Sequence, residues 1–217
     1  MPRVKICCIA DRDEAAMAVE AGASALGLVS EMPSGPGVID DETIAAVAGW
    51  APRGVETFLL TSRRAATAIA AQHARAGTTT IQLVDALPPD ELEALRGLLP
   101  GVTIVQVIHV RGPEAVEEAL AVEDRVDAIL LDSGNPDLAV KELGGTGRTH
   151  DWRWSRRIVE RTSRPVWLAG GLRPGNVRDA IEAVGPYGLD VCSGVRGGGG
   201  LDPERLRRFM GAVSDAS

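Results

Sequence analysis

Two mostly apolar segments near the end of the chain decide its fold. They are residues 166–172, with the sequence VWLAGGL, and residues 189–195, with the sequence LDVCSGV. Each segment runs into glycine, and each precedes a stretch of helical periodicity. A buried strand that ends in a glycine-containing turn and leads to a helix is the repeating unit of a parallel α/β sheet.

The same alternation extends back through the whole chain. Strand-like runs and helical stretches follow one another at about 27 residues per unit, which is the spacing of βαβ units. Eight units predict an α/β fold, a closed (β/α)8 TIM barrel, as a single domain over residues 1–217. An open, doubly wound sheet is the rival arrangement. The predicted strands are 4–9, 25–29, 55–61, 79–84, 103–110, 128–132, 166–169 and 189–193, and the predicted helices are 12–21, 41–51, 63–75, 89–99, 113–123, 152–161, 175–184 and 203–213.

Short-range signals mark some of the boundaries. Asp40 or Asp41 is placed to cap the second helix, and Gly77 lies where the third helix would end in a left-handed conformation. The glycine run at 197–200 has no anchoring residue, so we expect a flexible connection before the last helix.

Composition narrows the classes of function. Hydrophobic residues make up 45% of the chain, and the net charge is −7. This charge argues against partners such as nucleic acid or an anionic membrane, which need clustered cations. No apolar run is long enough for a transmembrane helix, and residues 1–5 do not resemble a signal peptide.

The cysteine pattern favours free thiols. Cys7, Cys8 and Cys192 are an odd count with two neighbours, which is a poor disulfide framework. No histidine or cysteine spacing matches a zinc site, so we expect no metal. The simplest interpretation is a cytoplasmic protein with reduced cysteines.

Glycines follow the last two predicted strands. In many barrels, backbone N–H groups at these two positions hold a phosphate, because glycine lets the backbone approach an anion closely. The sequence therefore predicts a phosphate site at Gly170, Gly171, Ser193 and Gly194. The alternative is that these glycines only form tight turns. A third cluster, at 144–147, lies in the long segment after the sixth strand.

Several motifs occur in an order that resembles one enzyme family. They are K-I-C-C-I at 5–9, A-G-A-S-A-L-G-L-V at 21–29, L-L-D-S at 130–133, G-G-T-G-R-T-H-D-W at 144–152, L-A-G-G-L at 168–172 and P-Y-G-L-D-V-C-S-G-V at 186–195. Together they resemble the phosphoribosylanthranilate isomerases of tryptophan biosynthesis over nearly the whole chain. The resemblance implies a cytoplasmic aldose-ketose isomerase that performs an Amadori rearrangement on a phosphoribosyl amine.

The resemblance makes Cys7 the general base and Asp132 the general acid. Opening the ribose ring needs a proton donor at the ring oxygen, and the resulting Schiff base then loses its C2′ hydrogen to a base. A thiol, with an ordinary pKa near 8.5, needs only a modest shift to act as that base. An aspartic acid must have a raised pKa, which a desolvated barrel mouth can supply. No metal or organic cofactor is required. The alternatives are that Cys7 is a buried small hydrophobe and Asp132 a turn residue.

Further contacts follow from the same resemblance. It implies that the substrate phosphate is bound by Gly170, Gly171, Leu172, Asp190, Cys192, Ser193 and Gly194, and that other substrate contacts come from Lys5, Gln82 and Gly145. His109, at the end of the fifth predicted strand, is a further candidate contact, and the alternative is an ordinary strand-end histidine. Strand alternation places Lys5 and Cys7 on one face of the first strand. It places Cys8 on the other face, toward the helices.

Four positions depart from the family pattern. Cys8 stands where the family has glycine, and Cys192 where it has serine. The sequence S-G-P at 34–36 replaces the family's S-P-R, whose arginine binds the anthranilate carboxylate, and Val84-Asp85 replaces its H-G. Loss of a charge-assisted contact of this kind costs about 1.5–3 kcal/mol of binding. Asp85 is also expected to add a negative charge near the aglycone.

Three hypotheses for function remain open. The first is an isomerase acting on N-(5-phosphoribosyl)anthranilate. The second is an isomerase of the same type with a different aglycone, which Pro36, Val84 and Asp85 suggest. The third is a non-catalytic barrel that binds phosphosugars, against which the presence of both Cys7 and Asp132 weighs.

Overall fold

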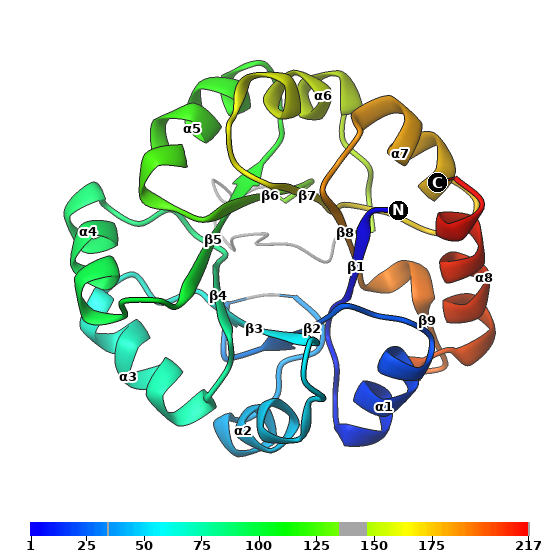
Figure 1. Cartoon of the computed structure of the whole chain (residues 1–217), viewed down its shortest axis with the longest axis horizontal. Coiled ribbons are helices and arrows are strands. Elements are labelled where there is room, and N and C mark those ends of the chain that lie inside the picture. The colour runs from blue at the N-terminus through cyan, green and yellow to red at the C-terminus, as the bar shows by residue number, and fades with distance from the viewer. Residues whose placement is uncertain (34, 135–146, 217) are drawn as a thin grey trace.

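The computed structural model describes residues 1–33, 35–134 and 147–216, and its parallel strands close into an eight-stranded barrel. Figure 1 shows the helices as a ring outside this barrel. The rival open sheet is excluded because β1 pairs with β8, with Lys5 opposite Asp190 and Ile6 opposite Val191. The barrel strands are β1 (Arg3–Ile6), β2 (Ala25–Val29), β3 (Glu56–Thr61), β4 (Thr80–Leu83), β5 (Thr103–His109), β6 (Ala128–Asp132), β7 (Val166–Leu168) and β8 (Gly188–Val191).

The helices lie close to their predicted positions. They are α1 (Arg12–Glu20), α2 (Asp41–Trp50), α3 (Ala66–Ala76), α4 (Pro89–Leu98), α5 (Glu114–Val122), α6 (Trp152–Arg161), α7 (Val177–Val184) and α8 (Pro203–Ser214). Asp40 caps α2 by accepting the Thr43 N–H at 2.7 Å, and Gly77 ends α3 with a φ of 64°. Among the described residues, no helix is long and apolar enough to cross a membrane.

The glycine run near the end of the chain is more ordered than the sequence suggested. Short strands β9 (Arg196–Gly197) and β10 (Gly200–Leu201) pair antiparallel. Gly198 and Gly199 form the turn between them, with φ of 61° and 92°. Two consecutive residues with positive φ are the requirement of a tight hairpin turn, so the glycines serve a defined turn and not a flexible connection.

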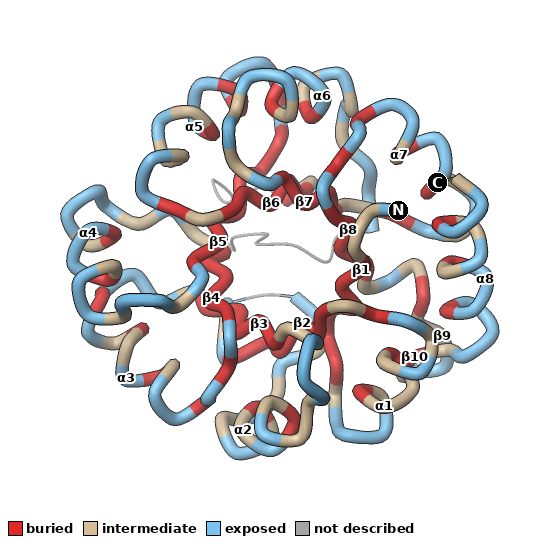
Figure 2. The backbone as a smooth tube through the Cα atoms, in the orientation of Figure 1, coloured by how far each residue is buried: buried red, intermediate tan, exposed pale blue. Residues whose placement is uncertain are grey.

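Apolar side chains form two concentric layers. Outward-facing strand residues such as Ile6 and Ile129 pack against the helices, and inward-facing residues such as Phe58, Val107 and Trp167 fill the barrel. Figure 2 shows the strands buried throughout, while the helices alternate between buried and exposed faces. Within the barrel, the rings of Phe58 and Trp167 meet edge to face at 5.6 Å. The barrel interior is therefore a packed core and not a channel.

One polar cluster interrupts this core. The Lys5 ammonium donates to Gln82 Oε1 at 2.6 Å and to Asp190 Oδ2 at 2.9 Å. Its side chain is completely buried, and Nζ lies 4.7 Å from the centre of the Phe58 ring. The cluster thus joins β1 to both β4 and β8 inside the barrel.

Glycines allow the segments after β6, β7 and β8 to pack on one another. A Cβ on Gly171 would lie 2.6 Å from the Arg148 carbonyl carbon, and a Cβ on Gly194 would lie 1.9 Å from the Leu172 carbonyl oxygen. Gly171 also has a φ of 62°. Close approach between backbones therefore demands glycine at both positions, whatever else they bind.

The buried ion pair yields a first prediction. Lys5→Met would leave the Asp190 carboxylate buried without its cation, so the free energy of unfolding should fall by about 3–5 kcal/mol in urea titrations at neutral pH. Lys5→Met combined with Asp190→Leu removes both charges and should recover most of that loss. Additive destabilisation in the double variant would contradict this account.

The glycine packing yields a second prediction. Gly194→Ala should lower the free energy of unfolding by about 1–3 kcal/mol, because the new methyl group overlaps the Leu172 carbonyl. Gly175→Ala is the matched control, since a Cβ there meets nothing within 4 Å. The control should change stability by less than about 0.5 kcal/mol. Equal effects of the two substitutions in thermal denaturation would refute the packing argument.

Candidate active site

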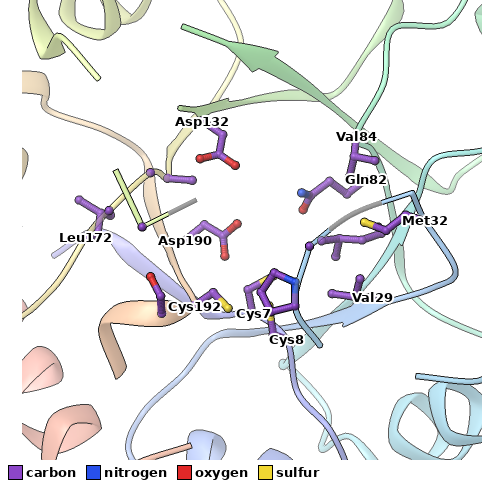
Figure 3. Close-up of a pocket in the computed structure, with 18 residues that line it drawn as sticks. Cys7, Cys8, Val29, Met32, Gln82, Val84, Asp132, Leu172, Asp190 and Cys192 are labelled. Atoms are coloured by element: carbon purple, nitrogen blue, oxygen red, sulfur yellow. The ribbon is translucent and has the colours of Figure 1, made fainter. Parts of the chain in front are cut away.

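A pocket opens at the carboxyl ends of the barrel strands. The empty space in it, which includes open solvent, is about 650 Å³. Figure 3 shows side chains from both halves of the chain converging on it. Its polar and thiol-bearing walls come from Cys7, Cys8, Gln82, Asp132, Asp190, Cys192 and Ser193.

Cys7 lies one residue beyond β1. Its N–H donates to the Val191 carbonyl at 2.8 Å, and its side chain is buried but reaches the pocket. A Cβ on Gly27 would lie only 2.7 Å from Cys7 Sγ. The thiol therefore occupies space that glycine leaves free on the β2 side of β1.

Asp132 ends β6 and faces the same pocket. Its Oδ1 accepts the Ser133 N–H at 2.7 Å, and the residue is 8% exposed. Burial raises the pKa of Asp132, and the Asp190 carboxylate adds to the rise, while the Ser133 N–H, His109 and Lys5 oppose it. A raised pKa favours a carboxyl group that can donate a proton.

Lys5 and Asp190 lie between these two groups. In Figure 3 the Asp190 carboxylate projects into the pocket between Asp132 and Cys7. Burial alone would lower the pKa of Lys5, but the Asp190 carboxylate, the Cys7 sulfur and the Asp190 hydrogen bond raise it above its ordinary value. Asp190 Oδ1 is buried and has no hydrogen-bond partner among the described residues. The floor of the pocket therefore combines a permanent cation with a free carboxylate oxygen.

The two glycine segments meet at one side of the pocket. Gly170, Gly171, Leu172, Cys192 and Ser193 all line it. The N–H groups of Gly171 and Ser193 donate to no backbone carbonyl in the described part of the chain. Gly194 lies behind this wall against Leu172. The position of Asp190 inside the barrel argues against the predicted phosphate contact, because a carboxylate repels a phosphate anion.

The opposite side of the pocket is apolar. It is formed by Val29, Met32, Pro36, Leu60 and Val84. Of these, the sequence singled out only Pro36 and Val84, since nothing in a local pattern distinguishes the other three from ordinary core residues. Asp85 does not line this pocket: its carboxylate accepts the Ala86 N–H at 2.9 Å and lies 4.0 Å from the Arg64 guanidinium. The expectation of a negative charge beside the aglycone stays a prediction, since Asp85 is not part of the pocket lining.

Cys8 also differs from expectation. Its φ is 64°, the left-handed region that favours glycine. Because β1 ends at Ile6, strand alternation no longer holds at this position, and Cys8 lines the pocket instead of facing the helices. The Arg196 guanidinium donates to the Cys8 carbonyl at 2.9 Å and stabilises the turn.

The remaining predicted contacts lie around the pocket in different ways. Gln82 lines it, while Lys5 lies beneath it and is fully buried. His109 is not among the lining residues; its Nε2 is 3.1 Å from the Val84 carbonyl oxygen. In β5 and β6, His109 pairs with Asp132. Gly145 is outside the described residues.

Comparison with known proteins agrees with this geometry. The family described as N-(5'phosphoribosyl)anthranilate (PRA) isomerase matches residues 4–212. The N-(5'-phosphoribosyl)anthranilate isomerase 2 of Methanosarcina mazei is 37% identical over 93% of this chain and 89% of its own length. The isomerase of Haloferax volcanii is 36% identical over 100% of this chain and 95% of its own.

Solved structures show the same architecture. The phosphoribosyl anthranilate isomerase of Thermotoga maritima superposes with a TM-score of 0.84 at 29% identity, covering 99% of this chain and 100% of its own. A phosphoribosyl anthranilate isomerase in complex with reduced 1-(o-carboxyphenylamino)-1-deoxyribulose 5-phosphate has a TM-score of 0.82 at 27% identity, with the same coverage. With the family match spanning almost every residue, this chain belongs to the N-(5'-phosphoribosyl)anthranilate isomerase family.

Proposed function

We propose that this protein catalyses the Amadori rearrangement of N-(5-phosphoribosyl)anthranilate to 1-(carboxyphenylamino)-1-deoxyribulose 5-phosphate. One observation carries the proposal: a buried aspartic acid with a raised pKa and a thiol line the same pocket, in a chain of the isomerase family. An aldose-ketose rearrangement of this kind needs one proton donor and one proton acceptor on the same sugar.

Asp132 and Cys7 each carry out one of the two proton transfers. Protonated Asp132 donates to the ring oxygen of the ribose, the bond from that oxygen to C1′ breaks, and a Schiff base forms. Cys7, as a thiolate, then removes the hydrogen from C2′, and the electrons of that bond neutralise the Schiff base. The resulting enolamine tautomerises to the ketone. Burial favours the neutral form of Asp132, which is the form that the first step requires.

Lys5 and Asp190, at the floor of the pocket, support the roles of Asp132 as acid and Cys7 as base. Cys7 contributes to raising the pKa of Lys5, so a buried cation lies near the thiol. Asp190 Oδ1, which lacks a partner among the described residues, is placed to accept a hydroxyl hydrogen of the sugar. We assign this role to Asp190 in place of a phosphate contact.

The phosphate is assigned to the glycine side of the pocket. The N–H groups of Gly171 and Ser193 can point toward an anion there, with Gly170, Leu172, Cys192 and Gly194 shaping the backbone around it. Gln82 is assigned a contact with the sugar. His109 and Gly145 stay predictions, the first because it lies outside the pocket lining and the second because it is not described.

A second candidate function concerns the aglycone. The apolar side of the pocket carries no cationic side chain among its described residues, whereas an aromatic carboxylate is held best by an arginine. This observation favours an isomerase that accepts a phosphoribosyl amine with an uncharged aromatic or aliphatic aglycone.

The expected setting of the enzyme follows from its composition. We propose that it works in the cytoplasm, where its three unbridged cysteines remain reduced. Its net charge of −7 supports a small-molecule substrate in preference to nucleic acid as its partner.

A third prediction tests the catalytic pair. Purified protein is mixed with freshly generated phosphoribosylanthranilate, and turnover is measured as the loss of substrate fluorescence. The kcat/KM should be about 10⁴ M⁻¹s⁻¹ or more. Cys7→Ala and Asp132→Asn should each lower it by about 10²–10⁴-fold. Asp85→Asn, whose side chain lies outside the pocket, is the control and should keep full activity. Full activity in Cys7→Ala would rule out the mechanism.

A fourth prediction follows from the raised pKa of Asp132. A carboxyl with a raised pKa in the folded state stabilises the fold at low pH, and this stability is lost as the pH rises through the folded pKa. Asp132→Asn is neutral at every pH. Its Tm should match that of the native protein near pH 4 and exceed it at pH 8. A variant that is less stable than the native protein at pH 8 would contradict the assignment of Asp132 as a buried acid.

A fifth prediction distinguishes the two aglycones. If anthranilate is the substrate, phosphoribosylanthranilate should be turned over faster than phosphoribosylaniline, which lacks the carboxylate. Pro36→Arg combined with Val84→His should then lower the KM for phosphoribosylanthranilate and leave that for phosphoribosylaniline unchanged. If the native enzyme prefers phosphoribosylaniline, the second candidate function is correct.

A further inference from the structure

All three cysteines of the chain line the same pocket. Cys7, Cys8 and Cys192 lie where β1 and β8 end beside each other, and none is in a disulfide. The proposed mechanism uses only Cys7. Cys8 and Cys192 stand at positions where the resembled family has glycine and serine, so neither thiol is needed for the rearrangement.

The register of the two strands brings these residues together. Ile6 is opposite Val191 in the pairing of β1 with β8, and the Cys7 N–H continues the ladder to the Val191 carbonyl at 2.8 Å. Neighbouring strands lie about 4.8 Å apart, and a disulfide joins Cα atoms that are about 4.4–6.8 Å apart. The register therefore leads to Cys7 opposite Cys192, with Cys8 the next residue along the chain.

The direction of each thiol selects the pair. Cys7 Sγ occupies the space over Gly27 in β2, which lies on the side of β1 away from β8. Cys8 follows the strand with a φ of 64°, and its thiol lies close enough to the thiols of Cys192 and Cys7 to interact with both. Figure 3 shows the sulfur of Cys192 directed toward the two adjacent cysteines. With the Cys7 thiol turned toward Gly27, Cys8 is the thiol that we pair with Cys192.

Exposure sets the order in which the two thiols react. Cys192 is partly exposed, whereas Cys8 is 4% exposed. The hydrogen bonds with Cys192 and Cys7, together with burial, raise the pKa of Cys8. A reagent that enters the pocket therefore reaches the Cys192 sulfur before the buried Cys8 sulfur.

We propose that Cys8 and Cys192 form a reactive dithiol that a small organic disulfide converts to an intramolecular disulfide bond. The Cys192 thiolate attacks one sulfur of the reagent RS–SR, whose S–S bond breaks and releases one thiol. Cys8 then loses its proton and attacks the Cys192 sulfur of the mixed disulfide, which releases the second thiol. Two protein thiols are oxidised, and one molecule of RS–SR is reduced to two molecules of RSH.

The bond would join two walls of the pocket. It would tie Cys8 to Cys192, and so change the spacing between the thiol side and the glycine side of the pocket. We expect a reversible loss of isomerase activity. This consequence rests on the proposed function, whereas the formation of the bond does not.

The test uses reduced, purified protein and 2-hydroxyethyl disulfide, a small uncharged reagent. After incubation, remaining thiols are capped with N-ethylmaleimide and intact chains are weighed. The native protein should carry one cap in place of three, with no retained reagent. Cys7→Ala should still form the bridge and carry no cap.

Cys8→Gly is the matched control, since glycine suits the φ of 64° and leaves Cys7 and Cys192 in place. It should stop at a mixed disulfide on Cys192, which adds the mass of one reagent half. A bridge in Cys8→Gly that forms at the native rate, or its loss in Cys7→Ala, would assign the bond to Cys7 and overturn the proposal. Retention of all three caps in the native protein would overturn it as well.

Activity is followed in the same samples. The native enzyme should lose turnover in step with the bridge and regain it with dithiothreitol. If the bridge forms but reduced protein never turns over phosphoribosylanthranilate or phosphoribosylaniline, the proposal of a reactive dithiol is supported and the proposed function is wrong. If the bridge forms and turnover is unchanged, the inference that the bond inactivates the enzyme by changing the spacing of the pocket walls is wrong.

Discussion

The ion pair between Lys5 and Asp190 is the interaction on which the rest of this structure depends. It lies inside the barrel at the seam where the first and last strands pair. A lysine with no exposed surface must have compensating partners, because an unpaired buried ammonium costs several kcal/mol. Asp190, Gln82 and the Phe58 ring supply them. The same contacts that satisfy the charge therefore hold β1, β4 and β8 in register.

This constraint also organises the chemistry of the pocket. With Lys5 held between the strands, Cys7 and Asp132 experience different surroundings although both are buried. The thiol lies near a cation, and the carboxyl lies in a desolvated position near a second carboxylate. Burial keeps the carboxyl of Asp132 protonated, as the role of an acid requires. The free oxygen of Asp190 then becomes a feature of the pocket, since its other oxygen is committed to Lys5.

The two sides of the pocket differ in how far they follow the family pattern. The glycine side keeps Gly170, Gly171, Ser193 and Gly194 of the family pattern, and Gly171 and Gly194 are also required where backbones pack closely. The other side presents apolar surface at Pro36 and Val84, where the family pattern has arginine and histidine. Between the sides lies a thiol-rich seam at Cys8 and Cys192. Substrate preference and redox sensitivity are therefore the properties in which this protein is expected to depart from its relatives.

Sequence alone determined the barrel and the family and singled out Cys7 and Asp132 as candidates, because these depend on local signals: the alternation of strands and helices, and short motifs at strand ends. Tertiary structure decided what depends on distant residues or on where a strand stops. Lys5 meets partners 77 and 185 positions away, which no local pattern reveals. Cys8 turns into the pocket because β1 ends before it, and Asp85 turns out of it because its carboxylate bonds to the next peptide N–H. Alternation of side chains holds only within a strand, so the residues just beyond a strand, where this pocket is built, are placed by the packing of the whole barrel.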